Sequence, residues 1–107
     1  FFTGATASMR GGSGFSAFSS AKFALRAVSQ SMARELGPQG IHVAHFVIDG
    51  AIDTAFIKEN FPDTYALKQK DGILQPDAIA DAYWFVHSQH RSAWTHELDL
   101  RPYMEKF

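Results

Sequence analysis

The chain has 107 residues, of which 46% are hydrophobic and 20% charged, a globular composition that excludes a disordered tail or a low-complexity segment. Ten basic side chains against eleven acidic ones give a net charge of −1, which argues against a nucleic-acid surface. The sequence lacks cysteine, a signal peptide and any apolar run of about 20 residues, so we expect a cytoplasmic protein that binds no membrane.

The chain is predicted to open with a short strand over residues 1–5, followed by a loop of small residues over 5–17. Within this loop, residues 12–17 match the dinucleotide-binding pattern G-x-G-x-x-A. That motif requires a strand directly before it and an acidic residue at the end of a second strand, whereas the available acid, Glu35, falls in a predicted helix. We interpret the segment as an ordinary loop that could border a site.

Helical periodicity begins at Ser19 and ends before Gly37-Pro38, which predicts a helix over 19–36. The apolar residues at three- and four-residue intervals are expected to face the sheet, with polar residues on the other side. The apolar positions are Leu25, Val28, Met32 and Leu36, and the polar ones are Arg26, Gln30 and Arg34.

Residues 41–48 are nearly all apolar or β-branched, which predicts a strand buried on both faces of a parallel sheet. Residues 54–74 mix aromatic and charged side chains and favour short helical pieces in a loop. A second main helix is expected over 76–88, opened by Pro76-Asp77, and a last strand over 93–98.

This order of strands and helices is typical of the end of a doubly wound α/β sheet, in which ligands bind beyond the carboxyl ends of the strands. The prediction is a Rossmann-like parallel sheet with three strands and two main helices. No internal repeat or linker divides the chain, so residues 1–107 are interpreted as one unit.

Three pieces in this order carry a resemblance: a strand ending at residues 3–5, a helix opening at 18–22, and a strand followed by residues 49–54. The chain resembles the C-terminal half of a short-chain dehydrogenase/reductase over its whole length. Lys22 falls on the lysine of the family motif Y-x-x-x-K, and residues 50–54 fall on P-G-x-x-x-T.

The resemblance implies an oxidoreductase that transfers hydride between NAD or NADP and a carbonyl or alcohol. It places Lys22 on the nicotinamide ribose, but Phe18 stands at the position of the proton-donating tyrosine and Ala5 at that of the catalytic serine, thirteen residues earlier. The residues implied in the cofactor pocket are Lys22, Gly50, Ile52 and Thr54.

Several residues keep alternative interpretations. Lys22 could instead be a surface lysine of an amphipathic helix, and Thr6 or Ser8 could replace the missing serine hydroxyl or bond to the local backbone. Asp49, where the family has proline, and Asp53 could work as an acid/base pair, or Asp49 could cap the strand end while Asp53 faces water.

The histidines do not predict a metal site, because His42 and His45 would face opposite sides of a strand and the pair His87 and His90 lacks a third ligand.

The glycine-rich turn that binds the pyrophosphate in the family has no match here, because Ser8 and Arg10 occupy positions where it needs glycine. We therefore expect the N-terminal dinucleotide-binding half to be absent, the chain alone to be inactive without a bound cofactor, and a full-length parent to bind NAD or NADP. The resemblance also implies a homo-oligomer formed through helix 19–36 and the last strand. The alternative function is a non-catalytic binding or assembly module on the same scaffold.

Overall fold

A computed structural model describes all 107 residues, and its strands form one parallel sheet in the order β1-β2-β3. The strands are β1 (Phe2–Ala5), β2 (His45–Ile48) and β3 (Glu97–Leu100). Phe2 lies opposite His45, and His45 in turn lies opposite Glu97. The predicted α/β class, with three strands in a parallel sheet, is confirmed.

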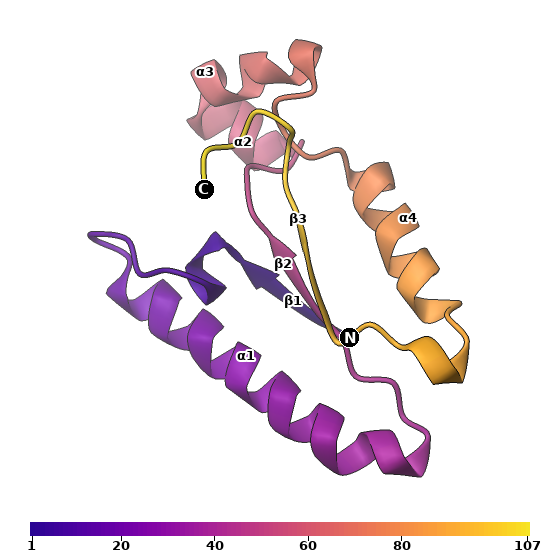
Figure 1. Ribbon diagram of the computed structural model, residues 1–107. Coiled ribbons are helices and arrows are strands. Elements are labelled where there is room, and N and C mark those ends of the chain that lie inside the picture. The colour runs from indigo at the N-terminus through magenta and orange to yellow at the C-terminus, as the bar shows by residue number, and fades with distance from the viewer.

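The helices lie on both faces of the sheet and beyond one end of it (Figure 1). α1 (Ser16–Leu36) covers one face, α4 (Pro76–His87) covers the other, and α2 (Ala55–Asn60) and α3 (Pro62–Tyr65) lie beyond the carboxyl ends of the strands. Short 3₁₀ turns link these elements at Thr6–Ser8, Gly37–Gln39, Ala66–Lys70 and Arg91–Ala93. None of the helices combines the length and the apolar character needed to cross a membrane.

Two predicted strands are displaced from their expected bounds. The strand expected over 41–48 is shorter and begins at His45, opposite Phe2, although the backbone oxygen of Ala44 still accepts a hydrogen bond from the Phe2 amide at 2.8 Å. The strand expected over 93–98 lies at Glu97–Leu100, where it pairs with His45–Ile48. Trp94 lies before it and stacks on the His42 ring, with 4.5 Å between ring centroids.

The helical predictions hold within a few residues. α1 begins at Ser16 rather than at Ser19, and α4 ends at His87. The mixed segment after β2 forms the short helices α2 and α3, as its composition indicated.

The apolar core lies between the sheet and α4. Phe46 is fully buried and its ring stacks on that of Tyr83, with 3.6 Å between centroids. Burying this apolar surface supplies the main free energy that holds α4 on the sheet. The buried members of the cluster are Ala44, Phe46, Ile48, Leu74 and Val86.

The predicted orientation of α1 is right only in part: Leu25, Met32 and Leu36 are half-buried, but the residues that the helix buries most deeply are polar. Ser19 and Ser29 are its buried residues, while Val28 of the predicted inward stripe is 48% exposed. Arg26, expected to face solvent, instead reaches across to β3. Ser19, Lys22, Arg26 and Ser29 follow one another at spacings of three, four and three, so they share one side of the helix.

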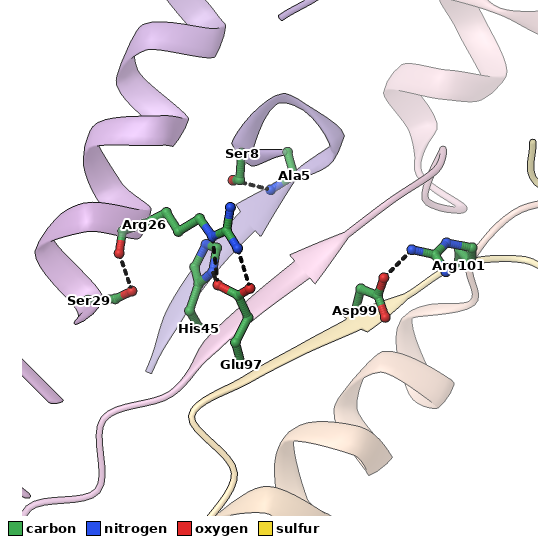
Figure 2. A network of polar contacts seen from close by, with 8 residues as sticks. All are labelled: Ala5, Ser8, Arg26, Ser29, His45, Glu97, Asp99 and Arg101. Carbon is green, nitrogen blue, oxygen red and sulfur yellow. Dashed lines mark hydrogen bonds and ion pairs between the residues drawn. The ribbon is translucent and has the colours of Figure 1, made fainter. Parts of the chain in front are cut away.

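An ion pair joins this polar side of α1 to the sheet (Figure 2). Arg26 donates from Nε to Glu97 Oε2 at 2.9 Å and from Nη2 to Glu97 Oε1 at 2.8 Å. His45 Nδ1 lies 3.0 Å from the same Glu97 Oε2, and the His45 side chain is completely buried. The hydrogen bonds from Arg26, assisted by His45, hold the pKa of the Glu97 carboxyl below its usual range.

Replacing the Glu97 carboxylate should therefore weaken the fold in a pH-dependent way. Glu97→Gln is expected to lower the free energy of unfolding at pH 7 by about 1–3 kcal/mol, because Arg26 loses its bidentate partner. The folded-state pKa of Glu97 is depressed, so its contribution is present above the unfolded value and is lost as the pH falls. Urea denaturation at pH 7 and pH 3.5 should show the difference from wild type shrinking at the lower pH.

The matched control is Glu35→Gln, at an exposed acid on α1, the helix of Arg26, that forms no ion pair. Equal losses for the two variants, or a Glu97→Gln loss that does not depend on pH, would contradict the role given to this ion pair.

Candidate functional site

The residues singled out by sequence come together at the carboxyl ends of β1 and β2. A hollow of about 380 Å³ opens there between these strands, the start of the β2–α2 segment and α1. We name it the lysine hollow, after Lys22. Its lining consists of Thr3, Gly4, Ala5, Thr6, Phe18, Lys22, Ile48, Gly50 and Ile52.

Lys22 reaches this hollow because it lies on the polar side of α1 that faces the sheet. Its Nζ donates a hydrogen bond to the backbone oxygen of Thr3 at 3.0 Å. Phe18 precedes it by one helical turn, and the ammonium group lies 5.8 Å from the centre of the Phe18 ring. Lys22 is the one titratable side chain among the residues that line the hollow.

Neither Phe18 nor Ala5 brings a hydroxyl group to the lysine hollow. The nearby hydroxyls are engaged elsewhere: Ser8 is buried and its Oγ accepts a hydrogen bond from the Ala5 amide at 3.0 Å. The Thr6 hydroxyl donates to Asp49 Oδ1 at 2.6 Å. The Thr6 hydroxyl proton is therefore hydrogen-bonded to the Asp49 carboxylate, and the Ser8 hydroxyl binds the backbone amide of Ala5.

Of the three residues after β2 that were expected in the cofactor pocket, Gly50 and Ile52 line the lysine hollow. Gly50 has a φ of 150°, and a Cβ at this position would lie 2.9 Å from Pro102 Cδ, so only glycine fits without a shift. Ile52 lines the hollow and pairs with Leu74 in an isolated bridge. Thr54 is not in the lining: its Oγ1 caps α2 by accepting from the Ile57 amide at 3.3 Å.

Asp49 is the most heavily hydrogen-bonded acid of the site and is only 2% exposed. Burial opposes its charge, but hydrogen bonds from Thr6 and Arg101 and the nearby Arg10 guanidinium hold the pKa of the carboxyl below its usual range. Asp53 forms a separate ion pair with Lys68 at 2.7 Å. Asp49 is therefore a fixed negative charge, and the two acids do not form an acid/base pair.

A second hollow, of about 270 Å³, adjoins the first, and we name it the arginine hollow after Arg10. Thr6 and Phe18 line both hollows. Arg10 and Ser19 enter the site here although neither was predicted to do so. The glycine-rich loop before α1 was the available signal. The remaining lining residues are Ala7, Gly11, Gly12 and Phe15.

None of the histidines lines the lysine hollow or the arginine hollow. His42 Nε2 lies 2.7 Å from the backbone oxygen of Thr95, and His45 contacts Glu97 as described above. No group of three or more histidine or acidic side chains is arranged to hold a metal ion.

Comparison with known proteins adds family-level evidence to this geometry. The family model described as Enoyl-(Acyl carrier protein) reductase matches residues 2–97. The fold is similar to the crystal structure of a short-chain dehydrogenase from Rhodopseudomonas palustris, with 52% sequence identity and a TM-score of 0.69. The match covers 96% of this chain but 37% of that one. No curated protein sequence matches the chain.

Proposed function

The chain belongs to the short-chain dehydrogenase/reductase family, and from this premise we propose that it is part of an oxidoreductase that uses NAD or NADP. The reaction proposed is hydride transfer between the nicotinamide cofactor and a carbonyl or alcohol substrate. The observation that carries the proposal is the lysine hollow, where Lys22 lies beside Gly50 and Ile52 at the carboxyl ends of the strands. Lys22 there faces open space rather than an acidic partner.

We propose that residues 1–107 form the C-terminal part of a larger domain. Phe1 is 47% exposed beside an open apolar hollow of about 540 Å³, which Ile79, Tyr83 and Trp84 also line. The outer edge of β1 is unpaired, and an unpaired edge with apolar neighbours is normally covered by another element. Alone, the chain is expected to bind a dinucleotide weakly and to be inactive.

When bound, the nicotinamide cofactor supplies or accepts the hydride. Lys22 Nζ has donors beyond the one it gives to Thr3 O, and these would bind the ribose hydroxyls. Gly50 and Ile52 border the same hollow and would contact the nicotinamide, while Thr54 fixes the start of α2 behind them. The residues present therefore fit the cofactor on the side that this chain contributes.

The proton that accompanies hydride transfer has few sources in this site. Phe18 and Ala5 have none to give, Thr6 donates its own to Asp49, and the Thr3 hydroxyl is hydrogen-bonded to the Tyr83 hydroxyl. We propose that the Lys22 ammonium group donates the proton to the substrate oxygen during reduction and accepts it back during oxidation. Lys22 would then combine binding of the cofactor with proton transfer.

Exposed apolar side chains support self-association and also a second candidate function. Val28 and Phe23 on α1 are 48% and 43% exposed, and Trp84 and Phe85 on α4 are 68% and 67% exposed. We propose a homo-oligomer through α1 and the β3 side of the sheet. A non-catalytic assembly module would retain these surfaces, and the missing hydroxyls at Phe18 and Ala5 favour that candidate.

Cofactor binding separates the two candidates. The full-length protein that contains this chain is expected to bind NADH or NADPH saturably, measured through the fluorescence of Trp84 and Trp94. Lys22→Met should raise the Kd by about 10-fold or more, because hydrogen bonds from a charged donor are lost. Lys70→Met, at an exposed lysine outside the site, is the control. Absence of binding would favour the assembly module, and equal affinity of Lys22→Met would refute the role of Lys22.

Restoring a hydroxyl beside Lys22 should raise carbonyl reduction. Phe18→Tyr combined with Ala5→Ser is expected to increase kcat/KM on a panel of aldehydes and ketones by about 100-fold, the size of a typical general-acid effect. Phe23→Tyr, at an exposed position of α1 that lines neither hollow, should give no increase. A double variant that binds the cofactor but gains nothing across the panel would contradict an intact pocket.

A further inference from the structure

The arginine hollow lies where the glycine-rich loop meets the first turn of α1. The residue before the helix, Phe15, provides no side-chain cap, and the first turn has no acidic residue. The first N–H groups of a helix have no partner within the helix and carry the positive end of its dipole. The start of this long helix therefore presents unpaired donors beside an open hollow.

Ser19 provides a second, independent indication of a ligand. The residue is 6% exposed and lines the hollow, yet its Oγ has no hydrogen-bond partner. A buried hydroxyl without a partner costs free energy, so the Ser19 hydroxyl calls for a partner from outside the chain, a water molecule or a ligand. A ligand oxygen in the hollow would accept the proton of this hydroxyl.

Arg10 brings a positive charge to the same hollow. Its side chain is 47% exposed and makes one side-chain contact, from Nη2 to Asp49 Oδ1 at 3.3 Å. Asp49 also receives Arg101 Nε at 3.4 Å and the Thr6 hydroxyl, so it does not depend on Arg10 alone. The other N–H groups of the Arg10 guanidinium remain available, and no acidic side chain lines the hollow.

The start of α1, the Ser19 hydroxyl and the Arg10 guanidinium together favour binding of an anion. The residues that line the hollow indicate which kind of anion fits. The planar fork of a guanidinium matches both a carboxylate and a phosphate, but Arg10 is the one cation that lines the hollow, and its single charge balances a carboxylate rather than a phosphate dianion. The rings of Phe15 and Phe18 border the donors, so an organic acid with an apolar body fits better than an inorganic ion.

We propose that the arginine hollow binds the carboxylate group of an organic acid through Arg10, Ser19 and the first turn of α1. Because Thr6 and Phe18 line both hollows, a carboxylate bound here would place the adjoining carbons of the same molecule toward Lys22. The substrate class is thus an oxo or hydroxy carboxylic acid. This assignment of the substrate rests on the proposed function, but binding of the carboxylate does not.

The test uses benzoate and its neutral analogue benzamide, titrated into the full-length protein without cofactor and followed by ligand-observed NMR. Benzoate is expected to bind at least 10-fold more tightly than benzamide, since a charge-assisted bidentate contact is lost in the amide. Arg10→Met should raise the Kd for benzoate by about 10-fold and Ser19→Ala by about 3-fold. Arg91→Met, at an exposed arginine far from the hollow in sequence, should leave it unchanged.

Ser19→Ala keeps the test decisive if Arg10→Met fails to fold, because it removes a hydroxyl that has no partner to lose. Equal affinity for benzoate and benzamide, or a Kd for benzoate unaffected by Ser19→Ala and Arg10→Met, would overturn the proposal. Benzoate binding by a protein that binds neither NADH nor NADPH would support the carboxylate site and overturn the oxidoreductase. Cofactor binding without benzoate binding would overturn the carboxylate site alone.

Discussion

The bidentate contact between Arg26 and Glu97 decides where α1 lies, and the site depends on that position. Because α1 presents a polar side to the sheet, the polar contacts that hold the helix there are the Arg26–Glu97 ion pair and the hydrogen bond from Lys22 to the backbone of Thr3. Lys22 lies one turn earlier on the same side, so the interaction that fixes Arg26 also aims Lys22 at the backbone of β1. The apolar core, on the opposite face beneath α4, leaves this side free for charged groups.

At the carboxyl ends of the strands, this arrangement concentrates cations where related enzymes are expected to use hydroxyls. Phe18 stands between two hollows, one containing Lys22 and the other Arg10. Asp49 lies behind both and remains ionised through its hydrogen bonds. The site therefore offers charge and hydrogen-bond donors in place of a titratable phenol, in keeping with the proposed anionic ligand and the proposed proton transfer by Lys22.

The sequence allowed the fold class, the family and the position of Lys22 to be predicted, because apolar strands, helix ends and motif spacing are local signals. It missed the polar side that α1 turns to the sheet, because the role of Arg26 on that side depends on Glu97, which lies 71 residues further along the chain. Arg10 and Ser19 were missed for the same reason: a loop and a helix start form a hollow only after the chain has folded.

A crystal structure of the full-length protein with its nicotinamide cofactor would test the central claim most directly. The account predicts that Lys22 Nζ lies within hydrogen-bond distance of the nicotinamide ribose hydroxyls and that the nicotinamide lies in the lysine hollow, beside Gly50 and Phe18. A cofactor bound elsewhere, with Lys22 still donating only to Thr3, would contradict it.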